Sequence, residues 1–553
     1  MEVEGEEIAE LLKSVEVGGK ECDVFIHNGN LTFQRLTHDG TKPPTYIPLN
    51  RILAIKPCES SGKRATLARK FSKKNGVEIT QSHSLKVYST RISRSGKWKL
   101  CKHSITCSSQ EDSQNFIEYI NNAIKEYVSS RPKHLMILIN PRGGKKNGEY
   151  IYRKYAAHIF NLADVKTSVF VTSHSDQARD QILEQDLSAY DGIIGVGGDG
   201  TINEIVNALL ARTQNEAGLD VDDPEVTLVR PKLKVGIIPA GSTDAIVFDT
   251  TGVSDPVTST LQIAQGFTVG LDVCSVHHSN YLLRYTLAFL GYGFFGDVVK
   301  ESEKFRWMGP NRYSLAGFLK YMRNQSYHGV VSYLPNDDHS HSPWDSEVCR
   351  AGCPVCKEKG EYSPTPATVT DDINIKVEDL CPSEKDVEKW ESKHGEFNAI
   401  NAAILSCTSV KAPGGVSRAA HLGNGCVDLV LVRRCSRLQY LRYMLRIALN
   451  GNPLDLNFVE VQRVKAFKFQ TTHPGPPRSD VEQCSEATAA DSGDVVYVPR
   501  RQASVSSTSS WNLDGEIAEQ PDIDVRVHCQ LIQLFALGPE VHDSKPSPFS
   551  CFR

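Results

Sequence analysis

Three glycine-rich turns contain the residues of this chain that are best suited to handling phosphate. They are NPRGGKKNG at 140–148, GGDGT at 197–201 and PAGSTD at 239–244, and each follows an apolar segment. Glycine lets backbone N–H groups approach phosphate oxygens closely, and the N-terminus of a following helix adds positive potential. A single glycine turn is usually only a turn, but three in one region predict a phosphate site.

The second turn contains Asp199, the best candidate for a general base. A carboxylate at a strand-to-helix turn can accept the proton of an acceptor hydroxyl and orient its oxygen for in-line attack. Its structural alternative is capping the helix that runs on from Ile202, which is compatible with catalysis. Glu204 falls in the first turn of that helix. Neither a Walker A sequence nor the protein-kinase signatures occur, so those two families are excluded.

Alternating strands and helices must position these turns. The sequence predicts strands at 135–140, 166–172 and 192–197, and helices at 150–162, 177–187 and 202–212. This alternation is typical of a parallel α/β sheet whose ligand site lies at the carboxyl ends of the strands. Beyond about residue 270 strand-like segments dominate, which predicts a second, mainly β domain.

The N-terminal region has a different pattern. Short strands between 20 and 106 precede one amphipathic helix at 111–128, and a small sheet with one C-terminal helix resembles pleckstrin-homology domains. Two basic runs, 63–74 and 91–99, could bind an anionic phosphoinositide membrane surface or could simply be solvated loops.

The predicted fold class is therefore α/β + β with three domains. A pleckstrin-homology-like membrane-targeting domain covers 1–125, an α/β nucleotide-binding catalytic domain covers 128–270, and a mainly β domain covers 271–540. Flexible, poorly ordered polar insertions are expected near 335–395 and 471–510. A length of 553 residues suits about three domains.

Composition excludes several classes of protein. A net charge of −4 does not suggest a nucleic-acid partner. The N-terminus is acidic, unlike a signal peptide, and no stretch reaches the roughly 18 apolar residues of a spanning helix. We therefore expect a cytoplasmic protein that associates peripherally with a membrane, either the plasma membrane or the Golgi. Of the 15 cysteines, 12 are scattered and are interpreted as reduced thiols.

The other three cysteines form a tight cluster, Cys349, Cys353 and Cys356. Such thiolates could bind zinc, with a fourth ligand from His339, His341 or Cys381, although the spacing is not that of a standard zinc finger. The alternative is a redox or structural thiol cluster without metal.

The motifs also carry a family resemblance. GGDGTINEIVNAL, INPRGGKKNG and GIIPAGSTDAIVF resemble the signature and nucleotide motifs of the diacylglycerol and sphingolipid kinase superfamily. Within it, the N-terminal region and the segments SVHHSNYLLRY, LGYGFFGDVVKESEKFRWMGPNRYSLAGF, CRAGCPVC and VRVHCQLIQLFALG resemble ceramide kinases. The resemblance covers nearly the whole chain. It implies transfer of the γ-phosphate of ATP, with Mg²⁺, to the primary hydroxyl of ceramide in a membrane.

The resemblance also implies roles for individual residues. Gly197, Gly198, Asp199 and Gly200 would meet the lipid acceptor, with Asp199 as the base. Asp514-Gly515-Glu516 would return to the nucleotide and its Mg²⁺, although from sequence alone it is an ordinary turn. The full set implied to bind the nucleotide is Asn140, Pro141, Arg142, Thr172, Ser173, His174, Ser175, Asp176, Glu204, Gly241, Ser242, Thr243, Arg306, Arg312, Asp514, Gly515 and Glu516.

One residue departs from the family pattern. Thr201 matches the diacylglycerol-kinase form of the signature. The resemblance to ceramide kinases would instead imply a larger apolar residue at this position. Phosphorylation of sphingosine or diacylglycerol therefore stays open. Two further alternatives are a catalytically inactive lipid-binding scaffold and an enzyme similar to NAD kinases, which also use a Gly-Gly-Asp-Gly turn.

A basic amphipathic segment at 431–445 suggests a further partner. Leu431, Leu438 and Met444 occupy positions one, eight and fourteen, the spacing of a calmodulin target helix, through which Ca²⁺ could act. Such a helix could equally cover a sheet or lie on an anionic membrane.

Overall fold

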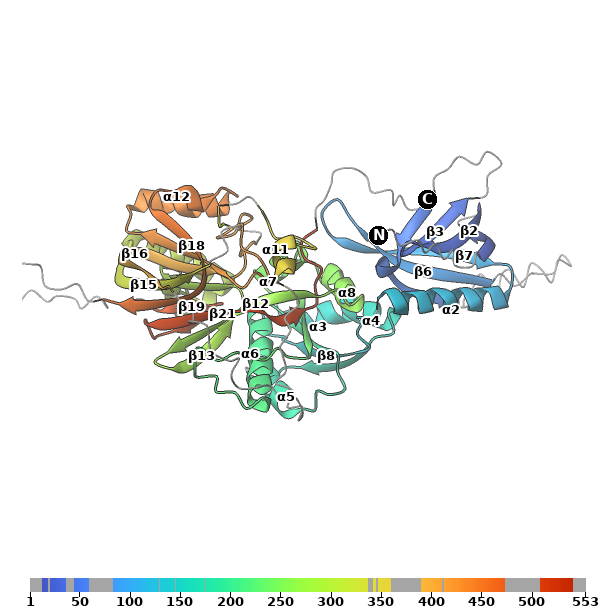
Figure 1. Ribbon diagram of the computed structural model, residues 1–553, viewed down its shortest axis with the longest axis horizontal. Coiled ribbons are helices and arrows are strands. Elements are labelled where there is room, and N and C mark those ends of the chain that lie inside the picture. The colour runs from blue at the N-terminus through green and yellow to red at the C-terminus, as the bar shows by residue number, and fades with distance from the viewer. Residues whose placement is uncertain are drawn as a thin grey trace, which may run out of the picture.

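The computed structural model describes residues 12–17, 20–35, 44–58, 83–128, 130–144, 146–174, 176–336, 342–344, 347–359, 389–409, 412–472 and 508–540. They form three bodies (Figure 1): an N-terminal body on the right, an α/β body at the lower centre and a β-rich body on the left. The expected insertions near 335–395 and 471–510 fall mainly outside these residues.

The N-terminal body is a seven-stranded sheet capped by one helix. Helix α2 (Gln110–Tyr127) begins after Ser109, whose side chain accepts a hydrogen bond from the backbone of Asp112 at 3.0 Å. Its buried face presents Phe116, Ile120 and Ile124 to the sheet. This confirms the predicted helix. The strands are β1 (Leu12–Val17), β2 (Lys20–His27), β3 (Asn30–Arg35), β4 (Thr45–Pro48), β5 (Ile52–Pro57), β6 (His83–Ile92) and β7 (Trp98–Cys107), in the order β4-β3-β2-β1-β7-β6-β5.

The α/β body is built on four parallel strands in the order β9-β8-β10-β11. They are β8 (His134–Ile139), β9 (Lys166–Val171), β10 (Gly192–Gly197) and β11 (Lys234–Pro239). The chain reverses direction across the sheet between β8 and β10, so the carboxyl ends of these two strands form a topological switch point. The helices are α3 (Gly148–Ile151), the π-helix η2 (Tyr152–Ala156), α4 (Ala157–Leu162), α5 (Gln177–Glu184), α6 (Asp199–Glu216), α7 (Ala245–Thr251) and α8 (Pro256–Ala264).

The β-rich body is antiparallel and is joined to the α/β sheet by the last strand. That strand, β21 (Ile523–Leu534), pairs along β12 (Val269–His278), and its end also meets β11, where Val235 pairs with Leu534. One 14-stranded sheet therefore runs through both bodies. The remaining strands are β13 (Tyr281–Thr286), β14 (Phe289–Gly293), β15 (Tyr327–Pro335), β16 (Glu391–Ala403), β17 (Val427–Arg433), β18 (Val459–Thr471), β19 (Trp511–Leu513) and β20 (Glu516–Ala518).

The helical elements of the β-rich body lie along its sheets. Helix α9 (Phe294–Ser302) leads through the short helix η3 (Glu303–Asn311) into α10 (Arg312–Arg323). The others are α11 (Pro354–Glu358), α12 (Arg437–Ala448) and the 3-10 turn η5 (Pro453–Asp455). Among the described residues, none of the helices combines the length and the apolar character that crossing a bilayer requires.

The β6–β7 hairpin attaches the N-terminal body to the α/β body. Trp98 is buried, its backbone N–H donates to Thr258 Oγ1 of α8 at 3.0 Å, and its indole N–H donates to Glu540 at 2.8 Å. The Arg51 guanidinium lies over the Trp98 ring, 4.1 Å from its centroid. An aromatic ring with satisfied polar partners makes a specific docking contact.

The second basic run, 91–99, lies partly in this docking contact. Lys97 pairs with Asp255 at the start of α8, at 3.7 Å, and Trp98 within the run is buried in the interface. Of the basic residues, Arg94, Lys97 and Lys99 stay exposed, so binding of an anionic membrane by this run remains a prediction. The first run, 63–74, lies outside the described residues.

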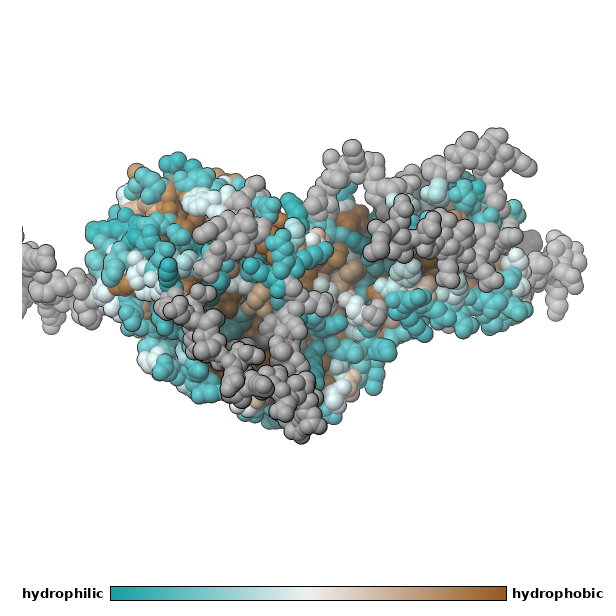
Figure 2. Space-filling model, viewed as in Figure 1, coloured by the Kyte–Doolittle hydropathy of each residue, from teal (hydrophilic) through white to brown (hydrophobic). Residues whose placement is uncertain are grey.

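The predicted calmodulin segment is not one helix. Leu431 lies fully buried in β17, and α12 begins only at Arg437, after a capping box formed by Ser436 and Gln439. Leu431 and Leu438 therefore cannot share a helix face in this fold. The helix buries Tyr440, Tyr443 and Ile447 against the sheet and leaves four leucines exposed, and Figure 2 shows apolar residues at the surface of α12. The exposed residues are Leu438, Leu441, Leu445 and Leu449.

Candidate active site

The three glycine turns converge at the carboxyl edge of the α/β sheet, as predicted. Gly144 has a φ of 54°, and a Cβ there would lie 2.6 Å from the carbonyl oxygen of Ala240 and 2.7 Å from the Cα of Gly241. The first and third turns are thus in backbone contact. Gly241 in turn lies against Gly198 of the second turn. No residue with a side chain fits this junction, which is the physical reason for the glycines.

The first turn is organised by Asn140, directly after β8. Its side-chain oxygen accepts from the backbone N–H groups of Arg142 and Gly143, at 3.0 and 2.9 Å. Its side-chain amide donates to Thr201 Oγ1 at 3.3 Å. Asn140 therefore links the first turn to the second and acts on the loop's shape, whatever it contributes to ligand binding.

Asp199 is the first residue of α6, but it caps a different helix. Its two carboxylate oxygens accept from the backbone N–H groups of Ala245 and Ile246, at 3.0 and 3.1 Å, at the N-terminus of α7. Burial raises the pKa of the Asp199 carboxyl above its ordinary value, and the backbone N–H groups oppose that shift. The carboxylate is thus fixed in orientation and made more basic, both of which suit a general base.

The Thr201 side chain does not face the place proposed for the lipid acceptor. It is buried, and a Cβ on Gly197 would lie 2.2 Å from its hydroxyl oxygen. The side chain therefore fills the space between Gly197 and Asn140. Any influence of Thr201 on the choice of lipid would be indirect, through the shape of the second turn.

Glu204 lies one turn further along α6, and its side chain reaches the start of α5, which follows the β9 loop. Its Oε1 accepts from the backbone N–H of Arg179 in α5 at 3.3 Å. Burial raises its pKa, and the nearby carboxylates of Asp176 and Glu516 raise it further. Asp176 precedes α5 in the left-handed region, with a φ of 64°. Glu204 thus contacts α5 and lies near enough to the distant Glu516 to be affected by its charge.

The loop after β9 holds the other predicted residues of this side. The backbone N–H of Thr172 donates to Ile139 at 2.9 Å, which keeps the loop beside the first turn. The backbone N–H of Ser173 donates to the Gln177 side chain at 2.6 Å, and the Ser173 hydroxyl lies 2.9 Å from His174. Ser175 lies outside the described residues.

The Asp514-Gly515-Glu516 turn returns to the site from the far end of the chain. Asp514 and Gly515 both have positive φ, the geometry of a tight hairpin turn between β19 and β20. Asp514 accepts from three successive backbone N–H groups, those of residues 287–289, at 2.6 to 3.0 Å. Glu516 pairs with Arg284 at 2.8 Å.

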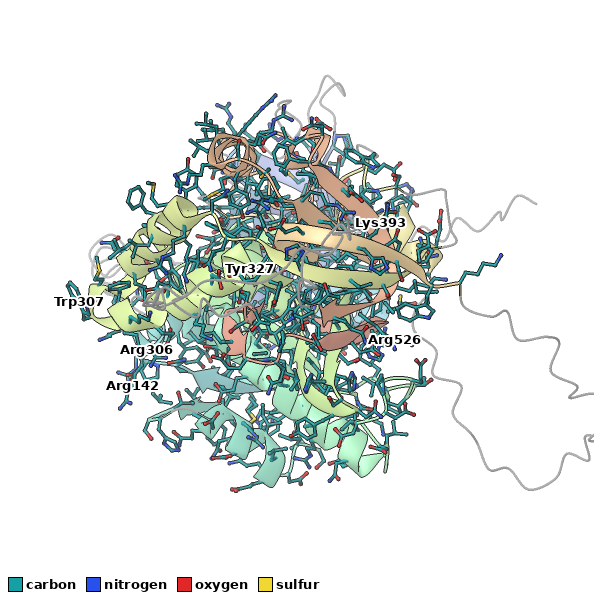
Figure 3. All side chains as sticks on the ribbon, turned by 90° about the vertical axis from the view of Figure 1, so that its left-hand side faces the viewer. Arg142, Arg306, Trp307, Tyr327, Lys393 and Arg526 are labelled. Carbon is teal, nitrogen blue, oxygen red and sulfur yellow. The ribbon has the colours of Figure 1, made fainter. Side chains whose placement is uncertain are left out.

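The predicted arginines differ in how firmly they are held. Arg312 pairs with Glu303 at 3.0 Å and lies over the ring of Tyr313. Arg306 also pairs with Glu303, but its side chain is 74% exposed. Figure 3 shows Arg142 and Arg306 at the same outer edge of the molecule, with Trp307 projecting beside them. None of the described contacts of Arg306 or Arg312 is to the glycine turns.

A buried carboxylate that was not predicted from the sequence couples the two bodies. Asp249 on α7 accepts from the Ser406 hydroxyl at 3.0 Å and from the backbone N–H of Cys407 at 2.7 Å, with further bonds from Thr408. Burial raises its pKa to about 6. Asp249, Asp514 and Asp199 all lie close enough to Cys407 to raise the pKa of its thiol, besides the effect of burial. An aspartate inside an apolar helix was the only sequence signal.

Asp244 belongs to the third turn, and no function was predicted for it from the sequence. It is buried with a φ of 53°, accepts from the backbone N–H of Gly241 at 3.0 Å, and accepts from the Ser254 hydroxyl at 3.0 Å. It therefore shapes the third turn as Asn140 shapes the first.

Two known families match this chain. The diacylglycerol kinase catalytic domain matches residues 134–276, and the ceramide kinase C-terminal domain matches residues 340–552. The first match contains the three glycine turns and Asp199.

Whole proteins are similar over most of the chain. A human protein named ceramide kinase is 38% identical over 91% of this chain and 90% of its own length. An Arabidopsis thaliana ceramide kinase is 30% identical over 80% of this chain and 79% of its own length. An Arabidopsis thaliana sphingosine kinase 1 is 28% identical, over 62% of this chain and 64% of its own length.

Proposed function

This chain belongs to the ceramide kinase family, and we propose that it transfers the γ-phosphate of ATP to the primary hydroxyl of ceramide, giving ceramide 1-phosphate. The observation that carries the mechanism is the position of Asp199. Its carboxylate is held by α7 at the junction of the three glycine turns, where a phosphate and a hydroxyl can both approach.

In the proposed reaction Asp199 accepts the hydroxyl proton. The acceptor oxygen forms a bond to the γ-phosphorus while the bond from that phosphorus to the bridging oxygen breaks, and its electron pair leaves with ADP. The raised pKa of Asp199 makes it a better proton acceptor than an ordinary aspartate, provided the pH keeps it ionised.

The nucleotide is proposed to lie along the turns around Asn140 and Gly241. The glycines keep bulky side chains away from this junction, because a Cβ would not fit at Gly144 or Gly241. Arg142 and Arg306 are proposed to pair with the phosphates, which requires Arg306 to exchange its exposed bond to Glu303. Glu204 and Glu516 are carboxylates suited to Mg²⁺, and a bound Mg²⁺ would neutralise charge on the phosphates.

Ceramide is favoured over the other acceptors by the extent of similarity. The ceramide kinase C-terminal domain covers the β-rich half, whereas the similar sphingosine kinase aligns with less of the chain. Sphingosine and diacylglycerol remain the alternatives for the acceptor. A catalytically inactive scaffold is disfavoured by the intact Asp199 and glycine junction.

We also propose that the N-terminal body is a pleckstrin-homology-like module that helps the protein meet a membrane. Its seven strands and single C-terminal helix support this. Exposed apolar residues outside it support contact with lipid as well: Trp307 is 83% exposed and Phe318 60% exposed, both close in sequence to Arg306. A surface that combines aromatic and basic side chains suits the bilayer interface.

Calmodulin binding at 431–445 stays a proposal that carries a structural cost. A calmodulin target helix with Leu431 as its first anchor would require β17 to leave the sheet. The exposed leucines of α12 could bind without that rearrangement.

The test is transfer of labelled γ-phosphate from MgATP to ceramide, sphingosine or diacylglycerol, each presented separately in mixed micelles, with Asp199→Asn as the control. Selective labelling of ceramide that Asp199→Asn abolishes is the expected result. Preferential labelling of another lipid would overturn the acceptor, and no labelling of any lipid would overturn the activity.

A further inference from the structure

Three cysteines and one histidine meet beside the apolar core that the β-rich body shares with the α/β body. Cys349, Cys353 and Cys356 come from the segment that contains α11, and His421 comes from the long loop between β16 and β17. Cys349, Cys353 and His421 are buried, and Cys356 is half-buried. The fourth metal ligands predicted from the sequence were His339, His341 or Cys381, and all three lie outside the described residues.

The distances fit one shared ion. The sulfur atoms of Cys349 and Cys356 are 3.7 Å apart, and Cys353 Sγ is 3.3 Å from His421 Nδ1. All four donor atoms lie within 4.8 Å of one another. A tetrahedral zinc ion about 2.3 Å from sulfur and about 2.0 Å from nitrogen would place sulfur pairs about 3.8 Å apart and sulfur–nitrogen pairs about 3.5 Å apart.

The same distances do not fit a disulfide, whose sulfur atoms are about 2.05 Å apart. The three cysteines are free thiols in the structure. Four donors, three of them soft thiolates, leave no open position for a substrate, which is the pattern of structural zinc. We therefore propose that Cys349, Cys353, Cys356 and His421 bind one structural Zn²⁺.

The surroundings support thiolate ligands. The backbone N–H of Leu422 donates to Cys349 Sγ at 3.5 Å, a contact of the kind that orients metal-bound sulfur. The backbone carbonyl of Cys356 accepts from the Gln530 side chain at 2.8 Å. These bonds fix the ligand segment to its neighbours independently of any ion.

The proposed ion would join two segments that are distant in sequence, and each of them contacts a further part of the fold. The ligand segment contacts the end of the chain, where Ala351 N–H donates to Pro539 at 2.9 Å. The His421 loop contacts β12, where Asp272 N–H donates to Leu422 at 2.8 Å. Val355 and Leu422 also belong to the apolar core that contains Leu271 and Leu534.

The His421 loop leads back to the candidate active site. Its first residues, 406–408, hold Asp249 of α7, and Val416 N–H donates to Ser406 at 2.8 Å within the same loop. The N-terminus of α7 donates to Asp199. Zinc would therefore position α7 from a distance and would take no part in the chemistry.

The direct test is the metal content of the purified full-length chain, measured by plasma mass spectrometry, together with X-ray absorption at the zinc edge. We expect about one zinc per chain with three sulfur ligands and one nitrogen ligand. Chain that contains no zinc and whose mass spectrum shows a disulfide among the three cysteines would overturn the proposal, as would thiols that all react freely in folded, metal-free protein.

Variants identify the ligands. Cys353→Ala and His421→Ala should lose zinc, whereas His421→Cys should retain it because four thiolates also bind zinc. Cys435→Ala, which removes a buried cysteine of a different core, should retain it too. Full zinc in His421→Ala would overturn the assignment of the fourth ligand. Because the first measurement uses the natural chain, it decides the presence of the ion even if a variant does not fold.

Discussion

Gly198 and Gly241 approach so closely that a Cβ on Gly241 would lie 2.6 Å from the Cα of Gly198. Real Cβ atoms do not come so near a backbone carbon, so the second and third turns can meet only while both residues are glycine. The same imagined atom would lie 2.4 Å from Asp244 Oδ1. The junction of the proposed phosphate site therefore depends on the absence of a side chain at both residues.

Gly241→Ala should separate the second and third turns. We expect kinase activity to fall at least tenfold and the melting temperature to drop, because backbone must move to admit the methyl group. Gly200→Ala is the matched comparison, since nothing lies within 4 Å of its Cβ position. It should keep the melting temperature. Equal stability of the two variants would contradict the close junction.

Asp199→Asn should lower kcat by about 10²- to 10⁴-fold, the usual contribution of a general base. The natural enzyme should also lose kcat/KM as the pH falls through the pKa of Asp199. Because burial raises that pKa, the acid limb should lie above the ordinary aspartate value of 3.8. Glu204→Gln should keep this limb, and a pH profile that lost it in Glu204→Gln would assign the titration to Glu204 instead.

The loops of the site could be predicted from the sequence because their signals are local. Each glycine turn follows a buried parallel strand, and the carboxyl ends of such strands meet at one edge whatever the tertiary details. The return of Glu516 to the neighbourhood of Glu204 could not be derived this way. It depends on how β19 and β20 pair more than 300 residues later, so only the family resemblance pointed to it.

Features that depend on long-range packing were missed or misread. His421 lies 65 residues after Cys356 and has no spacing signal, so the cysteine cluster lacked an identified fourth ligand. The basic run at 91–99 is predicted as an exposed loop, but the burial of its Trp98 against α8 has no sequence signal. Leu431 fits a helical spacing, but it lies in strand β17, because burial in the core outweighs local periodicity.

Trp98→Ala should loosen the attachment of the N-terminal body. Removing a buried tryptophan costs about 3 to 5 kcal/mol, and here it also removes one contact each of Arg51 and Glu540, which still pair with each other. We expect calorimetry to show the N-terminal body unfolding as a separate, earlier transition. Trp344→Ala should change the thermogram little, since Trp344 is 52% exposed. A single unchanged transition in Trp98→Ala would contradict the docking role.

Arg306→Ala should weaken the use of ATP. Hydrogen bonds to charged groups contribute about 1.5 to 3 kcal/mol, so kcat/KM for MgATP should fall about tenfold to hundredfold, with KM for ceramide unchanged. Arg434→Ala is the control, because Arg434 is similarly exposed, at 70%, and pairs with Glu396 in the β-rich body and not at the glycine turns. If the two variants behave alike, Arg306 does not reach the phosphates.

Arg463→Met should destabilise the loop that carries His421. Arg463 and Asp428 form an ion pair at 2.8 Å with side chains 3% and 1% exposed, and Arg463 also donates to the carbonyl of Ala419. Removing one partner leaves a buried charge, so the free energy of unfolding should fall by about 3 to 5 kcal/mol. Arg434→Met breaks the exposed pair with Glu396 and should cost at most about 1 kcal/mol.

Because Ala419 lies two residues from His421, Arg463→Met should also release zinc at lower chelator concentration than the natural chain, whereas Arg434→Met should not. Unchanged zinc release in a destabilised Arg463→Met would show that the ion pair supports the sheet and not the loop.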